Sequence, residues 1–239
     1  MREALRARRP LDRVLVARGA AGPHLQEIVD LCRGLNIPVR FEPRDRLDRA
    51  SEGAAHQGVV GIGAIHKYTT LDAIAEGARM LVVLDGVEDP HNLGAVVRTA
   101  HAVGADAVVI PERRAAGLTE AVAKAAAGAL EYLPVARVGN LNRALEELKQ
   151  RGFWIYGLDE RATQTHDAVE FAEPAAIVLG SEGEGLHRQV REHCDVLIRI
   201  PMSGNIASLN VSVAAGVVLF EWKRRRGERK TQTADTTAR

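Results

Sequence analysis

The sequence is poor in cysteine and contains no long apolar run. Its 239 residues include only two cysteines, Cys32 and Cys194, in widely separated parts of the chain. Two isolated cysteines argue against a disulfide framework and against a zinc cluster. No stretch reaches the roughly 18 consecutive apolar residues that a membrane helix needs, and residues 1–6 lack the apolar core of a signal peptide. We therefore expect no metal, no membrane segment and a cytoplasmic location.

Two nucleotide-binding signatures are also missing. The P-loop pattern G-x-x-x-x-G-K-[ST] does not occur in the chain, which argues against a nucleoside triphosphate as ligand. No G-x-G-x-x-G pattern follows the first apolar strand of either half of the chain. The sequence therefore disfavours a dinucleotide-dependent oxidoreductase.

The residues that are present give the composition of an ordinary globular protein with an uneven charge distribution. Hydrophobic residues make up 46% of the chain and charged residues 26%, which excludes disorder as the main state. Residues 1–70 hold 12 basic and 8 acidic side chains, residues 71–222 hold 13 and 21, and residues 223–239 hold 7 and 2. Two basic ends thus flank an acidic middle, although the net charge is only +1. This pattern favours nucleic-acid contact at the ends.

Residues 1–66 predict a small α/β domain. Apolar spacing, interrupted by glycine and proline, indicates short alternating helices and strands. The expected elements are a short helix around Leu5, a strand over 14–17, a helix over 24–35, a strand over 38–41, a charged helix over 44–50 and a strand over 59–65.

Residues 79–226 predict a larger α/β domain, joined to the first by a linker over 67–78. Its strands are uniformly apolar and alternate with helices, which is typical of a parallel sheet covered on both faces. The expected strands are 80–84, 107–110, 133–135, 153–156, 176–179 and 196–198, and the expected helices are 92–103, 118–128, 141–150 and 207–225. The polar segment 227–239 is expected to be disordered. The fold class is therefore α/β.

Three polar segments follow apolar strands of the second domain, where ligands gather in parallel α/β sheets. The first covers residues 85–98. We expect Asn92 to cap the helix that begins there, and Arg98, among apolar neighbours, to be partly enclosed. Either Arg98 makes a surface ion pair, or its guanidinium grips a phosphate through paired donors.

The second segment, 178–186, places three glycines after an apolar strand. Glycines allow a tight turn and the close approach of a ligand to the backbone. Two carboxylates, Glu182 and Glu184, would repel phosphate groups. The alternative is a structural turn that binds nothing.

The third segment, 200–215, leads from a loop into a strongly apolar helix. Ser208, Asn210 and Ser212 interleave there with apolar residues, and polar side chains in such a place need partners. Bonds back to the same helix would explain Ser212 but explain Asn210 poorly.

Together and in this order, the three segments resemble the three motifs of the SpoU (TrmH-type) RNA 2′-O-ribose methyltransferases of the SPOUT superfamily. The matching stretches are 85–98, 180–186 and 200–214, and 56–59 looks like the end of the family's N-terminal RNA-binding domain. The narrower likeness, at 91–95, 191–195 and 208–214, is to the subgroup that methylates a guanosine ribose in the peptidyl-transferase region of 23S rRNA.

The resemblance implies a two-domain architecture. Residues 1–66 would form an L30e-like RNA-binding domain, expected to be short because the family's domain usually begins a few residues earlier. Residues 79–226 would form a SPOUT domain with a deep trefoil knot. The long C-terminal helix would pack against a second copy in a homodimer.

The resemblance also implies a cofactor and a set of site residues. S-adenosylmethionine would contact Gly180, Ile200 and Leu209, mainly through their backbone atoms, with Met202 and Leu179 close by. The catalytic positions of the family correspond to Asn92, Arg98, Glu182, Ser208 and Asn210.

The reaction needs a proton acceptor, because a ribose 2′-hydroxyl is a poor nucleophile until it is deprotonated. Arg98 is the residue proposed in the family to assist, but a guanidinium with a pKa above about 12 is an awkward base. We therefore expect Arg98 to position the 3′-side phosphate and to be held by Glu182, while Ser208 and Asn210 orient the ribose.

Two other interpretations stay open. One is a methyltransferase of the same family that acts on tRNA or on another rRNA site. The other is a non-catalytic RNA-binding protein that keeps the fold, against which the complete set of catalytic positions counts.

Overall fold

The computed structural model describes residues 1–51, 55–63, 66–204 and 208–237. The chain divides into two compact units, Met1–His66 and Lys67–Arg239. In the described part of the chain, no helix combines the length and the apolar character that crossing a membrane requires.

The first unit is a three-stranded sheet with helices on it, close to the elements predicted from the sequence. In chain order it contains α1 (Arg2–Arg6), β1 (Leu11–Ala17), α2 (Pro23–Gly34), β2 (Val39–Glu42), α3 (Arg44–Ala50) and β3 (Val59–Gly63). The strand order is β2-β1-β3, with β1 parallel to β2 and antiparallel to β3. Alternate residues of β1 face opposite sides: Val14 and Val16 pack with Ile28 of α2, and Leu15 packs with Leu47 of α3.

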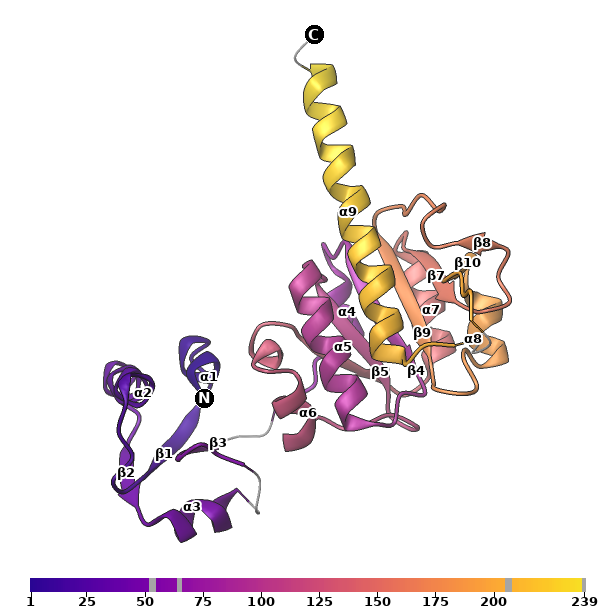
Figure 1. Ribbon diagram of the computed structural model, residues 1–239. Helices are drawn as coiled ribbons and strands as arrows, with labels where there is room; N and C mark the ends of the chain where they lie inside the picture. Colours follow the sequence, from indigo (N-terminus) through magenta and orange to yellow (C-terminus); the bar gives the residue numbers. More distant parts are fainter. Residues whose placement is uncertain (52–54, 64–65, 205–207, 238–239) are drawn as a thin grey trace. The chain divides into compact units, whose positions relative to one another are not determined.

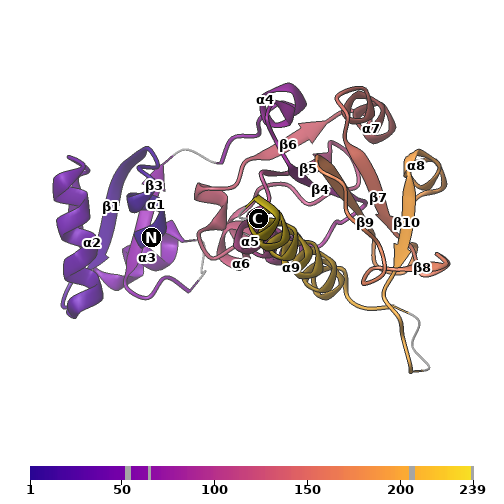
Figure 2. The same cartoon turned by 90° about the horizontal axis from the view of Figure 1, so that it is seen from above.

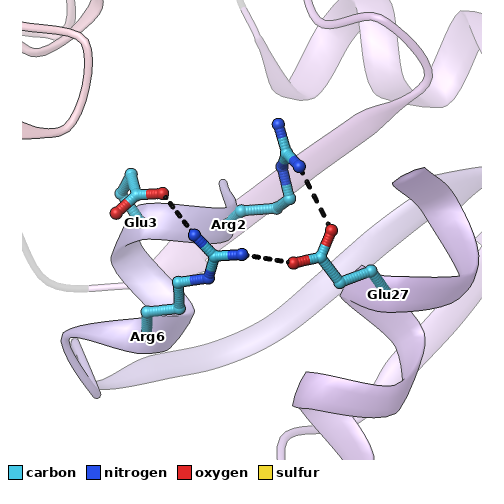
Figure 3. Close-up of polar contacts among 4 residues, drawn as sticks. All are labelled: Arg2, Glu3, Arg6 and Glu27. Atoms are coloured by element: carbon cyan, nitrogen blue, oxygen red, sulfur yellow. Dashed lines mark hydrogen bonds and ion pairs between the residues drawn. The ribbon is translucent and has the colours of Figure 1, made fainter.

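A cluster of charged side chains joins α1 to α2 in this unit (Figure 3). Glu27 of α2 accepts hydrogen bonds from Arg6 Nη2 at 2.6 Å and from Arg2 Nη1 at 3.1 Å. Arg6 also donates to Glu3 at 3.1 Å. The bonds from Arg2 and Arg6 hold the pKa of Glu27 below its ordinary value.

The second unit is a seven-stranded, fully parallel sheet, as the apolar strands predicted. Its strands are β4 (Met80–Asp85), β5 (Ala107–Pro111), β6 (Val135–Val138), β7 (Trp154–Leu158), β8 (Gln164–Thr165), β9 (Ala175–Gly180) and β10 (Val196–Arg199). The strand order is β6-β5-β4-β9-β7-β10-β8. The late strand β9 therefore lies between β4 and β7.

Helices cover both faces of this sheet. They are α4 (Leu71–Ala75), α5 (Pro90–Val103), α6 (Glu120–Ala125), the 3-10 turn η1 (Ala129–Glu131), α7 (Leu141–Gln150), α8 (Arg188–His193) and α9 (Val211–Thr237). Seen from above, α5, α6 and α9 lie on one side of the sheet and α4, α7 and α8 on the other (Figure 2). Within β4, Val82 and Leu84 pack toward the first group of helices and Leu81 and Val83 toward the second. Burial on both faces explains why the strands are apolar without alternation.

The start of α5 differs from the prediction that Asn92 caps it. The helix begins at Pro90, and Asp89 is its N-cap, with the Asp89 side chain accepting a bond from the backbone N–H of His91. A proline at the first helical position after an aspartate is a favourable helix start. Asn92 therefore lies inside the first turn, where its side chain is free for other contacts.

The last helix also differs from the prediction. The predicted start at residue 207 lies outside the described residues, and the helix as described begins at Val211 and continues to Thr237. The expectation that segment 227–239 lacks regular structure is thus wrong up to Thr237. No proline interrupts this stretch, so nothing in the backbone ends the helix. Figure 1 shows α9 beside α5 and extending past the edge of the sheet.

Candidate active site

The polar segments meet at the carboxyl edge of the parallel sheet. Asp85, the last residue of β4, pairs in register with Gly180, the last residue of β9. The loops that follow these two neighbouring strands therefore leave the sheet side by side. The loop after β10 reaches the same edge and leads into α9.

A three-residue hydrogen-bonded cluster joins all three segments. Asn92 Nδ2 donates to Glu182 Oε1 at 3.0 Å, and Asn210 Nδ2 donates to Asn92 Oδ1 at 3.0 Å. Asn210 Nδ2 also donates to Glu182 Oε1. Asn92 is 7% exposed, so its polar atoms need these partners. Two amide donors directed at one carboxylate oxygen fix the position of Glu182.

Asn210 also caps the start of α9. Its Oδ1 accepts a hydrogen bond from the backbone N–H of Ser212 at 2.9 Å and from Ser212 Oγ at 2.6 Å. The side chain therefore caps the helix with its oxygen and holds the cluster with its nitrogen. Ser212 bonds within its own helix start, as expected, and Asn210 bonds across to other elements.

One cavity, which we call the Leu179 cavity, has a volume of about 430 Å³. It is lined by eight of the ten residues proposed from the sequence: Leu179, Gly180, Glu182, Ile200, Met202, Ser208, Leu209 and Asn210. Its lining also includes the carboxylates of Asp159, Glu160 and Glu184. Apolar walls suit an adenine ring, and carboxylates without a phosphate-binding loop suit a cationic ligand.

The backbone of the following turn leaves no room for a side chain at Gly180. A Cβ atom there would lie 2.1 Å from the carbonyl carbon of Gly185 and 2.4 Å from the nitrogen of Leu186. The close approach is fixed by two backbone bonds of 3.1 Å between Ser181 and Gly185. The glycine-rich segment is therefore a closed turn that brings its backbone to the cavity wall.

The buried Asp159 forms an ion pair with the partly exposed Arg191 on the wall of the Leu179 cavity. Arg191 Nε lies 2.5 Å from Asp159 Oδ2, and the side chain of Asp159 is 4% exposed. Asp159 Oδ1 also accepts from the backbone N–H of Arg161 at 2.8 Å. Sequence reasoning missed this pair, because nothing in the local pattern relates the loop after β7 to α8.

A second cavity, which we call the His187 cavity, has a volume of about 460 Å³. Its lining includes Gly86, Asn92, Arg114 and His187. It shares Ser181, Glu182, Glu184 and Val211 with the Leu179 cavity. Glu182 thus stands on a wall common to the two cavities.

Arg98 is the one sequence-proposed residue that the structure places apart. It is exposed on α5 and lines neither cavity. The expectation that its charge is partly enclosed is wrong, because its side of α5 faces solvent. The expected contact between Arg98 and Glu182 is also not found within the described chain, since Glu182 is bound by Asn92 and Asn210 instead.

No group of three or more histidine, cysteine, aspartate or glutamate side chains capable of holding a metal ion occurs among the residues that the structure describes. The two cysteines are free. Burial raises the pKa of the Cys194 thiol to about 12, which makes it a poor nucleophile at neutral pH.

Comparison with known proteins identifies the family. Residues 79–220 match the model of the SpoU rRNA Methylase family, and residues 1–69 match a model described as RNA 2′-O ribose methyltransferase substrate binding. The chain belongs to the SpoU rRNA methylase family. It is therefore an RNA methyltransferase by family, in agreement with the resemblance of its three motifs.

Relatives of the family match along nearly the whole chain. YacO of Bacillus subtilis (strain 168), whose name places it among TrmH family tRNA/rRNA methyltransferases, is 44% identical over 230 residues, which cover 94% of this chain and 92% of YacO. The 23S rRNA (guanosine-2′-O-)-methyltransferase RlmB of Pseudomonas aeruginosa is 44% identical over 217 residues, which cover 88% of this chain and 87% of RlmB.

A solved SpoU methyltransferase shares the fold. AviRb of Streptomyces viridochromogenes, crystallised with the cofactor AdoMet, superposes with a TM-score of 0.79 at 24% identity, over 95% of this chain and 87% of AviRb. The α/β architecture expected from the sequence is thus confirmed both by the parallel sheet and by this neighbour.

Proposed function

We propose that this SpoU-family protein transfers the methyl group of S-adenosylmethionine to a ribose 2′-hydroxyl, with a guanosine of 23S rRNA as its target. The observation that carries the proposal is the placement of Glu182, fixed by Asn92 and Asn210, on the wall shared by two cavities. One cavity has the lining for the cofactor, and the other adjoins it from the side of α5. This arrangement lets two ligands meet at one point.

The Leu179 cavity fits the cofactor by the chemistry of its lining. When bound, S-adenosylmethionine supplies an electrophilic methyl group on a positively charged sulfur. Leu179, Ile200 and Leu209 offer apolar contact to the adenine, and the turn at Gly180 presents backbone atoms to it. The carboxylate of Glu182, which is bound by two uncharged amides, lies on the same wall and favours a positive charge, whereas Asp159 is paired with Arg191.

The target nucleotide would occupy the His187 cavity and reach the shared wall with its ribose. Ser208 and Asn210 line the cofactor side of that wall and would orient the sugar. Arg98 would position the 3′-side phosphate. Because Arg98 lies outside both cavities, it can do so only for RNA that extends along α5, or across the face shared with a second copy.

We propose a homodimer in which α9 provides that face. Val213 and Phe220, seven residues apart on α9, are each 51% exposed although both are apolar. Two turns of an α-helix bring residues at this spacing onto one side. The position of β9 between β4 and β7 is compatible with the trefoil knot that the family resemblance implies.

RNA binding is assigned to the first unit, residues 1–66, with 67–78 as linker and 79–226 as the methyltransferase domain. The match of residues 1–69 to a substrate-binding model supports this division, as does the excess of arginine in this part of the chain. A ribosomal RNA substrate places the proposed activity in the cytoplasm.

The choice of a 23S rRNA guanosine rests on the likeness to RlmB. YacO, at the same identity, carries a name that covers both tRNA and rRNA. If the methyl group is transferred to tRNA or to another rRNA site, the proposed substrate is wrong but the proposed reaction still holds.

The test combines cofactor binding with mapping of the product. We expect calorimetry to show one S-adenosylmethionine per chain, and the protein to label rRNA with radioactive methyl groups. Mapping of 2′-O-methyl marks in rRNA and tRNA, with and without the protein, should show one additional guanosine in 23S rRNA. Absence of cofactor binding would identify a non-catalytic RNA-binding protein, and a mark on tRNA would change the substrate.

A further inference from the structure

A buried carboxylate holds a histidine on the wall of the His187 cavity. Asp85, at the end of β4, is 5% exposed. Its Oδ2 accepts from the backbone N–H of His187 at 2.8 Å, and its Oδ1 bonds to Nδ1 of the same residue at 2.9 Å. These two bonds, made by one carboxylate to the backbone and ring of one residue, fix the position of the imidazole.

The contacts also assign the proton on the ring. Arg114 Nη1 lies 3.2 Å from His187 Nε2, and a guanidinium can only donate. Nε2 therefore carries the lone pair, and Nδ1 carries the proton that Asp85 accepts. Gly86, at φ 81°, lets the ring pack closely, since a Cβ there would lie 3.2 Å from Cε1 of His187. The ring is thus held with its basic nitrogen toward Arg114, which lines the same cavity.

The proposed reaction releases a proton and needs a group that accepts it. Arg98 is a guanidinium and lies outside both cavities. The Glu182 oxygen Oε1 already accepts bonds from two amides. The charged or titratable groups that line this cavity with His187 or bond to it are Asp85 from β4, Glu88 and Asp89 before α5, Arg114 after β5, and Glu182 and Glu184 after β9. Among the residues that line the cavity, His187 carries the imidazole, the side chain suited to proton transfer near neutral pH.

We propose that His187 Nε2 accepts the proton of the ribose 2′-hydroxyl, with Asp85 as its positioning residue. The inference rests on the proposed function. The 2′-oxygen forms a bond to the methyl carbon while the carbon–sulfur bond breaks and leaves its electron pair on sulfur. The hydroxyl proton passes to Nε2, and the resulting imidazolium, stabilised by Asp85, returns it to solvent. Arg114 is exposed and gives up its bond to Nε2 when the hydroxyl takes its place.

The test is the pH dependence of methyl transfer in a single turnover, with S-adenosylmethionine and rRNA both saturating. For the wild type we expect a rate that falls at acid pH, because protonation of Nε2 removes the proton acceptor. For His187→Gln we expect a loss of roughly 100-fold or more at neutral pH and no acid limb. Cofactor affinity, measured by calorimetry, should stay within threefold of wild type.

The chain offers a matched control on the same helix. His193, at the end of α8, bonds to Gln189 and Glu146 and lines neither cavity. His193→Gln should keep the wild-type rate and pH profile. His187 makes no side-chain capping bond to α8, so its replacement does not remove a helix cap.

Two further variants separate proton transfer from a structural role. In His187→Ala, added imidazole should restore part of the rate, with a dependence on the concentration of neutral imidazole. In Asp85→Asn, the acid limb should move to lower pH, because the carboxylate that stabilises the imidazolium is gone.

Transfer by His187→Gln at the wild-type rate, or with an unchanged acid limb, would overturn the proposal while leaving the proposed function intact. Failure of imidazole to restore any rate to His187→Ala would count against proton transfer by this residue. A wild-type protein that binds the cofactor but methylates no RNA would instead overturn the proposed function, and this inference with it.

Discussion

Asn210 Nδ2 donates to Asn92 Oδ1 at 3.0 Å, across a separation of 118 residues. This bond links the first turn of α5 to the residue before α9, and both side chains converge on Glu182. The side chain of Asn210 thus caps α9 and also holds Glu182 in the candidate site.

Substitution of Asn210 can separate these two roles. Asn210→Ser keeps a good helix cap, so the cap itself should change by only a few tenths of a kcal/mol. The variant loses the amide donor to Glu182, and a hydrogen bond to a charged group is worth roughly 1.5–3 kcal/mol. We therefore expect methyl transfer to fall about tenfold to 100-fold while the amides in the first turn of α9 keep their protection. Hydrogen exchange and single-turnover kinetics measure the two effects, and a parallel loss of protection at the start of α9 and of rate would contradict the separation.

Gly180→Ala should weaken cofactor binding. The added methyl group would lie within 2.4 Å of the backbone at Gly185 and Leu186, so the turn would have to open. We expect calorimetry to show at least a tenfold weaker affinity for S-adenosylmethionine. Gly204→Ala is the control, because a methyl group there meets no atom within 4 Å. Equal affinity of the two variants would show that the closed turn is not needed.

Arg98→Lys tests the phosphate contact. Lysine keeps the charge but not the paired donors. With cofactor and RNA saturating, we expect methyl transfer to fall about tenfold while the affinity for S-adenosylmethionine is unchanged. Arg143→Lys, on α7 at the other face of the sheet, should have no effect. A rate for Arg98→Lys near that of the wild type would remove Arg98 from the catalytic group.

The exposed apolar side of α9 predicts self-association. The double variant Val213→Asp and Phe220→Asp should sediment as a monomer at micromolar concentration, where the wild type sediments as a dimer. Trp154→Glu changes another exposed apolar side chain, 50% accessible at the start of β7, and should remain dimeric. A monomeric wild type would exclude the proposed dimer.

The Glu27 cluster predicts an acid-sensitive first unit. The pKa of Glu27 is lowered from its ordinary value of 4.5 by hydrogen bonds from Arg2 and then Arg6. A lowered folded-state pKa gives a stabilising contribution that is present above about pH 4.5 and is lost as the pH falls through the folded-state value. Glu27→Gln should therefore lower the protection of α1 amides at neutral pH and weaken its pH dependence between pH 3 and 5. Hydrogen exchange read by mass spectrometry measures this, and identical profiles would contradict it.

The sequence predicted the layers of the fold better than the contacts at the site. Strands such as β4 and β9 are apolar because both faces are covered, and this pattern is local and visible. The helix α8 was not expected, because its only buried residue is Val190 and its other side chains are polar or charged. The prediction that Asn92 caps α5 was wrong because Asp89 followed by Pro90 makes a more favourable helix start, three residues earlier.

In the candidate site too, some residues could be predicted from the sequence and others could not. The motif resemblance named eight residues that line the Leu179 cavity. It included Asp85 in the first motif without a role and did not include His187; the contact between these two residues spans 102 residues and depends on the path of the glycine-rich turn. The position of Arg98 relative to the cavities likewise depends on the rotation of α5, and residue type alone does not reveal it.

The position of β9 has a consequence for biosynthesis. β4 and β7 have no contact as neighbouring strands, because β9 pairs with both. Before β9 has been synthesised, one edge of β4 has no neighbouring strand. At that stage Asp85 lacks both Gly180, its partner in the sheet, and His187, its hydrogen-bond partner. The site can therefore form only late in translation, after β9 has entered between β4 and β7 and the chain has reached residue 210. An incomplete chain that ends before Asn210 cannot assemble the cluster around Glu182.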